Sequence, residues 1–160
     1  MANTELMVGM AAPEFPGLKE LLGKIVVLYF YPKDFTLGCT QESCDFRDAY
    51  AEIQKVGGVV FGVSKDTAES HQKFREKYTL PFSLLSDPDG KMTDAYGCRR
   101  ERATFVIDHD GIIRRIWKKV NVKRHVEEVA YFVQLLQGQR TSGLLRASIT
   151  ASTPAAKCGH

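Results

Sequence analysis

The chain has 160 residues, which is enough for one domain with a sizeable core. Its 22 basic and 19 acidic residues are interspersed and leave a net charge of +3, so the composition indicates no nucleic-acid or membrane-surface partner. The longest apolar run, residues 25–31, is too short to cross a bilayer, which takes about 20 residues.

The N-terminal stretch MANTELMVGMAAPEF lacks the basic start of a secretory signal and carries Glu5. A cytoplasmic location is therefore predicted. In that compartment the four cysteines are expected to be reduced, and to be catalytic or metal-binding rather than structural disulfides.

The first half of the chain predicts a strand, a helix and a second strand. Residues 1–23 are irregular, whereas residues 24–31 are apolar on both alternations, which is typical of a strand buried on both faces. A helical pattern follows over residues 39–55, and residues 59–64 form a second buried strand. The apolar stripe of that helix consists of Phe46, Ala49, Tyr50 and Ile53. This order predicts two parallel strands joined by a right-handed crossover.

The second half predicts helices and a hairpin. The predicted elements are a helix from Asp66 to about Tyr78, a strand end and a turn at 84–90, a short helix near 92–96, strands at 103–108 and 112–117, and a helix over 122–136. Asp66 with Glu69 resembles a capping box, and His109-Asp110-Gly111 is a hairpin signal. Residues 139–160 lose the periodicity, so we expect one domain over 1–138 and a flexible tail.

The resulting element order, βαβα–ββα, describes an α/β thioredoxin-like fold. Its central sheet is expected to be mixed and flanked by helices, with an extra segment between the second helix and the hairpin. Within this fold, a cysteine lies at the junction between the first strand and the first helix, and this junction is the candidate site.

Cys39 lies in the first turn of the predicted 39–55 helix. Free backbone N–H groups and the helix dipole favour an anion at this end, and the thiolate is the reactive form of cysteine. Cys39 precedes Phe46 by two helical turns, which places it on the core-facing stripe. A recessed thiolate suits a small substrate better than a protein substrate. The alternative is a buried, inert thiol.

The segment FYPKDFTLGCTQESCDFRD closely resembles the active-site segment of the peroxiredoxins, specifically the bacterioferritin-comigratory or peroxiredoxin Q subfamily. The family's Pro-x-x-x-Thr-x-x-Cys motif falls on Pro32, Thr36 and Cys39. Its Cys-x-x-Glu falls on Glu42, and its arginine before a Thr/Ser-Phe strand falls on Arg102.

The resemblance covers about residues 8–137 and implies a thiol-specific peroxidase that reduces hydrogen peroxide and organic hydroperoxides, in antioxidant defence. The family's chemistry runs through a sulfenic acid on Cys39. Its resolving cysteine falls on Cys44, which implies an intramolecular Cys39–Cys44 disulfide reduced by thioredoxin or another dithiol donor. No cofactor or metal is implied. We expect a monomer or weak dimer, with no nucleic-acid or membrane partner.

The resemblance also implies roles for the residues around Cys39. Arg102 supplies fixed positive charge to the thiolate and the transition state. Thr36 hydrogen-bonds the peroxide or the sulfur, and Pro32 keeps water and a competing donor away from the sulfur. Glu42, one helical turn after Cys39, is expected to orient Arg102 rather than to act as a base.

The spacing of Cys39 and Cys44 has a mechanical consequence. Positions five apart on an α-helix have Cα atoms about 8–9 Å apart and point about 140° away from each other. A disulfide requires Cα atoms within about 7 Å. A Cys39–Cys44 bond therefore cannot form in an intact helix, and we predict that residues 38–46 unwind once per cycle.

The other candidates are weaker. Cys98 is expected to be a packed residue, and Cys158 lies in the predicted tail. Either cysteine could serve as an alternative resolving thiol. The histidines at 71, 109 and 125 are scattered and are predicted to be solvated. Leu37 occupies a position where the family usually has proline, which predicts a looser turn.

Two rival functions use the same thiols. One is a redox sensor or binding module whose disulfide changes a partner surface, and the combination of Thr36 with Arg102 disfavours it because signalling alone does not require them. The other is a thiol–disulfide oxidoreductase acting on proteins. The absence of a Cys-x-x-Cys motif argues against thioredoxin itself.

Overall fold

The structure is a computed structural model, and it describes residues 6–98 and 101–145. Its elements, in chain order, are the 3-10 helix η1 (Lys19–Leu21), β1 (Ile25–Phe30), α1 (Leu37–Lys55), β2 (Gly58–Ser64), α2 (Ala68–Tyr78), β3 (Ser83–Ser86), α3 (Lys91–Ala95), β4 (Ala103–Ile107), β5 (Ile113–Lys118) and α4 (His125–Leu145).

The strands form one mixed sheet in the order β3-β2-β1-β4-β5. β1 pairs in parallel with β2 and antiparallel with β4, while β2 and β3 are parallel and β4 and β5 antiparallel. The strand–helix–strand unit and the hairpin predicted from the sequence are therefore present. The extra segment between α2 and the hairpin consists of the short edge strand β3 and the helix α3.

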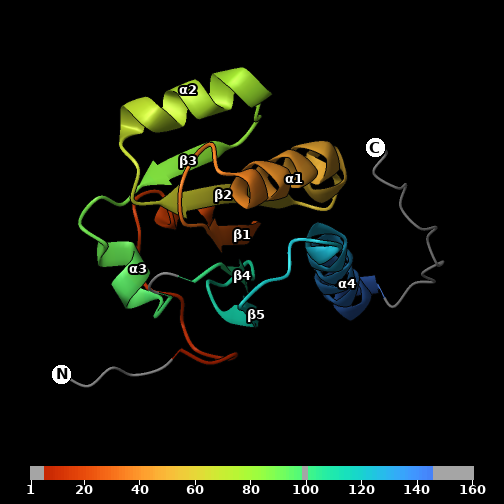
Figure 1. Cartoon of the computed structure of the whole chain (residues 1–160). Helices are drawn as coiled ribbons and strands as arrows, with labels where there is room; N and C mark the ends of the chain where they lie inside the picture. The colour runs from red at the N-terminus through yellow and green to blue at the C-terminus, as the bar shows by residue number, and fades with distance from the viewer. Residues whose placement is uncertain (1–5, 99–100, 146–160) are drawn as a thin grey trace.

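β1 is the centre of the core, because every one of its side chains is buried. Ile25, Val27 and Tyr29 face a cluster that α1, α4 and Phe74 of α2 cover. The alternate residues of β1 face a second cluster, which the N-terminal segment and Tyr96 close. Figure 1 shows α1 and α4 lying beside each other, with α3 apart from both. The prediction of a strand buried on both faces is confirmed.

Two local predictions need correction. α1 begins at Leu37, two residues earlier than predicted. The N-cap of α2 is Thr67, whose side-chain oxygen accepts a hydrogen bond from the Ser70 amide, so Asp66 and Glu69 do not form the expected capping box. Asp66 instead accepts hydrogen bonds from the backbone of Asp34 and the hydroxyl of Ser64.

The last helix is longer than its periodicity suggested. α4 runs to Leu145, past the predicted boundary at residue 138, and the rest of the predicted tail, residues 146–160, lies outside the described residues. The division into a domain and a flexible tail stays a prediction. Within the described chain, no helix is both long and apolar enough to span a bilayer.

Candidate active site

The site begins in the loop that joins β1 to α1. Phe35 has φ of +68°, a left-handed conformation that turns the chain towards the helix. Thr36 then takes an extended conformation as the N-cap of α1, with φ −79° and ψ 159°. Its hydroxyl donates to the carbonyl oxygen of Lys33 at 2.9 Å and does not cap the helix. The first turn of α1 therefore keeps free backbone N–H groups around Cys39.

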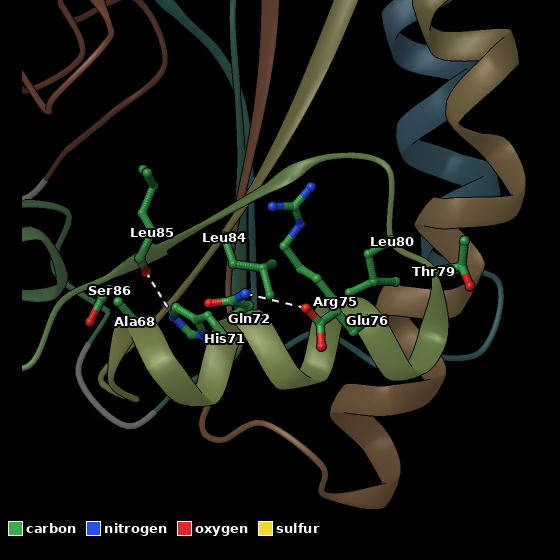
Figure 2. Close-up of a pocket in the computed structure, with 10 residues that line it drawn as sticks. All are labelled: Ala68, His71, Gln72, Arg75, Glu76, Thr79, Leu80, Leu84, Leu85 and Ser86. Carbon is green, nitrogen blue, oxygen red and sulfur yellow. Dashed lines mark hydrogen bonds between the residues drawn. The ribbon is translucent and has the colours of Figure 1, made fainter.

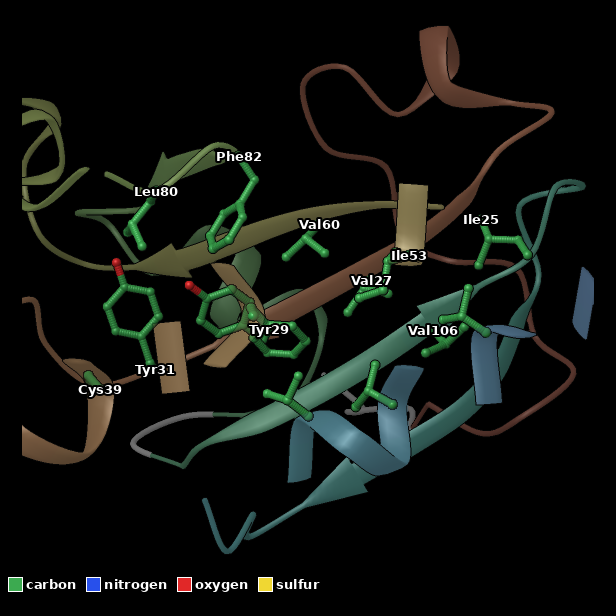
Figure 3. Close-up of a cluster of buried hydrophobic side chains, with 14 of the residues drawn as sticks. Ile25, Val27, Tyr29, Tyr31, Cys39, Ile53, Val60, Leu80, Phe82 and Val106 are labelled. Carbon is green, nitrogen blue, oxygen red and sulfur yellow. The ribbon is translucent and has the colours of Figure 1, made fainter. Parts of the chain in front are cut away.

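Cys39 lies on the inward face of the first turn of α1. Its exposed fraction is 0%, the same as that of Phe46 two turns later, and it belongs to the core cluster that includes Tyr29 and Tyr31. Figure 3 shows Cys39 at the edge of this cluster. The thiol is free. The prediction from helical phase that Cys39 points into the core is confirmed.

Arg102 connects the helix to the sheet. It precedes β4, and its Nη1 lies 3.5 Å from Cys39 Sγ and 2.8 Å from Glu42 Oε1, donating to both. Gly38 makes room for it, because a Cβ at that position would lie 3.0 Å from Arg102 Nη2. The sequence predicted that Arg102 would meet Cys39 and Glu42, and the structure brings the three together.

Glu42 is completely buried, with an exposed fraction of 0%. Its Oε1 is paired with Arg102, but among the described residues its Oε2 has no hydrogen-bond partner. Burial raises the pKa of Glu42 to about 7, although the hydrogen bond and charge of Arg102 oppose that rise. The expected contact between Glu42 and Arg102 is present. The degree of burial was not expected.

Cys44 lies on the same unbroken helix as Cys39 and is partly exposed. Both thiols are free in this conformation. Burial raises the pKa of the Cys44 thiol, with Arg47 acting in the opposite direction. The two cysteines are thus held apart in the way that the helical spacing predicts.

The remaining predicted residues lie at the surface or elsewhere in the fold. Pro32 and Thr36 are both exposed. Cys98 is buried in the second core cluster, and burial raises the pKa of its thiol to about 12. Cys158 lies outside the described residues. Cys98 is therefore a packed residue, as predicted.

Two histidines that were predicted to be solvated are buried. His71 has an exposed fraction of 3% and lies 2.8 Å (Nδ1) from Asp34 Oδ2. His125 is equally buried, and its Nε2 hydrogen-bonds the hydroxyl of Thr104 at 2.8 Å. Burial, aided by the charge of Arg102, lowers the pKa of His125 to about 4, so this imidazole is neutral. The signal was available, since both histidines continue the apolar stripes of their helices.

The histidine of α2 also lines a surface pocket. The pocket lies between α2 and β3, and Figure 2 shows His71 at one end with its Nε2 hydrogen-bonded to the carbonyl oxygen of Leu85. Neither Cys39 nor Arg102 lines it. We therefore do not assign this pocket to the thiol chemistry.

One group among the described residues could geometrically hold a metal ion. Ligand atoms of Asp34, Asp66 and His71 lie within 4.8 Å of one another. Their polar atoms are already engaged, however, because Asp34 accepts from Tyr31, Ser70 and His71. The group therefore acts as a hydrogen-bonded cluster, and we assign no metal to it.

Comparison with known proteins relates this arrangement to one family. A model described as the AhpC/TSA family matches residues 16–116. A putative peroxiredoxin Bcp from Coxiella burnetii is 46% identical over 143 residues, covering 76% of this chain and 95% of that protein. Peroxiredoxin Bcp from Bacillus subtilis is 45% identical over 123 residues, covering 69% of this chain and 78% of the relative.

Solved structures agree with the sequence relatives. The bacterioferritin comigratory protein of Xanthomonas campestris, studied for its alkyl peroxide reduction activity, superposes with a TM-score of 0.72 at 32% identity. The match covers 75% of this chain and 84% of that one. The thioredoxin-like fold predicted from the element order is thereby confirmed.

Proposed function

This chain belongs to the AhpC/TSA family of peroxiredoxins, on its Bcp and peroxiredoxin Q branch, and from that membership we propose that Cys39 is the thiol that attacks the hydroperoxide. The chain is a thiol peroxidase acting on alkyl hydroperoxides. One observation carries the assignment: the Arg102 guanidinium lies 3.5 Å from the buried Cys39 sulfur at the start of a helix.

The first step forms an S–O bond and breaks the O–O bond. The Cys39 thiolate attacks the terminal oxygen of R–O–O–H, the alkoxide leaves and takes up a proton, and Cys39 becomes a sulfenic acid. Negative charge moves from sulfur to the leaving oxygen during this step. Arg102 and the free N–H groups of the first turn of α1 are fixed donors that can follow that charge.

Thr36 and Pro32 act at the mouth of the site in this proposal. The Thr36 hydroxyl donates its hydrogen to the carbonyl oxygen of Lys33, so the lone pairs of the hydroxyl oxygen remain able to accept a hydrogen bond from the peroxide O–H. Pro32 has no backbone N–H that could compete for the sulfur. Both side chains are exposed, whereas Cys39 itself has an exposed fraction of 0%, so the sulfur is shielded from water before substrate binds.

Cys44 resolves the sulfenic acid. Its sulfur attacks Cys39 Sγ, a disulfide forms and water leaves. The helical separation of the two cysteines forbids this bond while α1 is intact, so the first turns of α1 must open. Opening also exposes Cys44 to water, which removes the burial that raises its pKa and favours the attacking thiolate.

The disulfide then requires two electrons from outside the chain. A family enzyme of this kind takes them from a thiol reductant, and we propose thioredoxin or a similar dithiol donor. A bond formed by unwinding a helix is strained in the folded state and therefore readily reduced. A cytoplasmic location, where such donors are abundant, and a monomeric or weakly dimeric state stay predictions.

Stopped-flow consumption of an alkyl hydroperoxide with a dithiol donor tests the assignment. We expect Cys39→Ser to lose turnover entirely. Cys44→Ser is expected to reduce one equivalent of peroxide and then stop, because it cannot form the disulfide that the dithiol donor reduces. Cys98→Ser is the control, because its buried thiol lies in the other core cluster. Wild-type turnover no faster than that of Cys39→Ser would overturn the peroxidase role, and turnover retained in Cys44→Ser would transfer resolution to another thiol.

Amide hydrogen exchange tests the opening of the helix separately. Residues 38–46 are expected to exchange faster in the oxidised protein than in the reduced protein, while α4 keeps its protection. Equal protection of residues 38–46 in both redox states would contradict helix opening and leave the first step untouched.

A further inference from the structure

The buried cluster around the nucleophile contains one cation and two acidic groups. Arg102 Nη1 donates to both Cys39 Sγ and Glu42 Oε1, and the exposed fractions of Cys39 and Glu42 are both 0%. If the thiol and the carboxyl were both ionised, the cluster would hold a net charge of −1 out of contact with water. A buried uncompensated charge of this kind is strongly disfavoured.

Among the described residues, the elements packed around Glu42 provide no second positive charge that acts on the Glu42 carboxyl group. On α1, Asp45 adds negative charge. On β1, burial holds the pKa of Tyr29 well above its usual range, so this phenol is neutral. On α4, His125 is neutral as well. Among residues 6–98 and 101–145, Arg102 is thus the one positive charge that Cys39 and Glu42 have in common.

The geometry of the carboxyl group fits a proton. Glu42 Oε1 is bound to Arg102, whereas Oε2 is buried with no hydrogen-bond partner among the described residues. An ionised carboxylate would leave half of its charge on that unpartnered oxygen, whereas a protonated one places a neutral hydroxyl there. The cluster is therefore built to hold one proton on its acidic groups.

We propose that Cys39 and Glu42 share this single proton, so that Glu42 is protonated when Cys39 is a thiolate. The inference rests on the proposed function of Cys39 and changes the expected role of Glu42 from orienting Arg102 to storing the proton as well. The step then balances: Cys39–S⁻, Glu42–COOH and R–O–O–H become Cys39–S–OH, Glu42–COO⁻ and R–OH. Glu42 acts on the sulfur through Arg102 and the shared proton, and is a positioning residue.

Coupled titration supplies the test, because each group must shift the other by the same amount. Glu42→Gln keeps an oxygen for Arg102 but cannot ionise. In this variant the alkylation of Cys39 by iodoacetamide is expected to reach half its maximal rate about one pH unit lower than in wild type. Glu52→Gln, a partly buried position further along α1, is the matched control and should leave the profile unchanged.

The carboxyl group is observed directly by infrared spectroscopy of the reduced, substrate-free protein. A protonated-carboxyl band that Glu42→Gln removes is expected near pH 7 in wild type. Cys39→Ser removes the competing anion, so the band should disappear at a pH lower by the same interval. This measurement does not require Glu42→Gln to be active.

The outcomes separate the inference from the proposed function. No Glu42 band near pH 7, a band that Cys39→Ser does not move, or a Glu42→Gln alkylation profile at the wild-type pH or higher would each overturn proton sharing. None of these depends on peroxide. Failure of the peroxidase assignment would appear instead as absent turnover in wild type, with the two titrations still coupled.

Discussion

Two buried charged clusters include residues of the segment that joins β1 to α1: one is built around Asp34 of the loop, the other around Cys39 in the first turn of α1. The cluster before α1, here called the Asp34 cluster, consists of Tyr31, Asp34, Ser70 and His71. The Cys39 cluster consists of Cys39, Glu42 and Arg102. The carboxyl side chains of both are almost inaccessible to water, with exposed fractions of 1% for Asp34 and 0% for Glu42.

The clusters differ in how completely their polar atoms are paired. Asp34 Oδ1 accepts from the Tyr31 hydroxyl at 2.5 Å, and Oδ2 accepts from His71 and Ser70, each at 2.8 Å. His71 Nε2 lies 3.1 Å from the carbonyl oxygen of Leu85, so both ring nitrogens of His71 have hydrogen-bond partners. Within the described part of the chain, Glu42 in contrast has one oxygen without a hydrogen-bond partner, and it shares the Arg102 cation with Cys39.

This difference sets opposite proton affinities for two equally inaccessible carboxyls. For Asp34, burial would raise the pKa, but the hydrogen bonds from His71, Tyr31 and Ser70 outweigh it and lower the pKa. For Glu42, burial dominates and raises the pKa to about 7. Burial alone therefore does not decide the charge of an interior carboxyl. The donors around it contribute as well, and we expect the Asp34 cluster to serve stability and the Cys39 cluster to serve reactivity.

Removing the cation from the Cys39 cluster is the strongest way to break this contrast. Arg102→Met is expected to lower kcat/KM for an alkyl hydroperoxide by about 100- to 1,000-fold, because a fixed donor to the developing charge is lost. The loss of stability should be small, since Glu42 can take up a proton and become neutral. Stopped-flow kinetics and urea unfolding measure the two effects.

The control for Arg102→Met is Arg114→Met, which breaks a half-exposed ion pair with Asp108 elsewhere on the sheet. We expect it to leave the rate unchanged. If Arg102→Met unfolds the protein as readily as loss of a buried ion pair does elsewhere, the two clusters are not as different as proposed.

Asp34→Asn probes the other cluster. It replaces a buried carboxylate that accepts three hydrogen bonds, so the free energy of unfolding at pH 7 is expected to fall by about 2–3 kcal/mol. The rate of peroxide reduction should change by less than about 10-fold, because the side-chain hydrogen bonds of Asp34 in the described structure go to the Asp34 cluster and not to the Cys39 cluster. Urea denaturation and stopped-flow kinetics on the same preparation test this pairing of a large stability loss with a small rate loss.

The pH dependence of stability should have opposite signs for the two carboxyls. The lowered pKa of Asp34 gives a contribution that is present at neutral pH and is lost as the pH falls through about 4 and below. The raised pKa of Glu42 means that the folded state binds its proton more tightly, so stability declines as the pH rises from 4.5 to about 7. Glu42→Gln should abolish that decline, and Asp34→Asn should leave it in place.

The Cys39 side of this contrast could be predicted from the sequence, whereas the Asp34 side could not. The helical phase of Cys39 relative to Phe46 predicted its burial, and the motif residues predicted the approach of Arg102. The pairing of Asp34 with His71 joins residues far apart in the chain, and nothing local in the sequence specifies such a contact. The unpaired oxygen of Glu42 likewise depends on which side chains surround it after folding.

Gly38→Ala tests how closely the Cys39 cluster is fitted. A Cβ at this helical position would lie 3.0 Å from Arg102 Nη2, so the guanidinium must move by a few tenths of an ångström. We expect the rate of peroxide reduction to fall by about 5-fold, since small misplacements of a catalytic group are costly. The helix itself should become more stable by about 0.5–1 kcal/mol, as is usual when alanine replaces a helical glycine.

Gly138→Ala is the matched control for Gly38→Ala, because a Cβ on this glycine of α4 would meet nothing within 4 Å. It should give the same gain in stability with no change in rate. Equal rates for the two variants would show that Arg102 tolerates displacement and that the close fit at Gly38 has no role.

Leu37→Pro tests the opening of α1, and it gives the smallest expected effect. Leu37 is the first residue of α1 and has an exposed fraction of 88%. The N–H of a first helical residue has no partner within the helix, and the extended conformation of Thr36 suits a residue that precedes proline. Proline should therefore stabilise the folded helix by about 0.5–1 kcal/mol, mainly by restricting the unfolded chain.

If the first turn of α1 must unwind before Cys44 can reach Cys39, the same restriction opposes the unwinding. Disulfide formation in Leu37→Pro should then be about 2- to 5-fold slower, while the rate of sulfenic acid formation is unchanged. Rapid thiol blocking after addition of one equivalent of peroxide measures the rate of disulfide formation. Leu37→Ala removes the exposed side chain without restricting the backbone and should resolve at the wild-type rate. A proline variant that is more stable but forms the disulfide just as fast would mean that unwinding begins after the first turn, closer to Cys44.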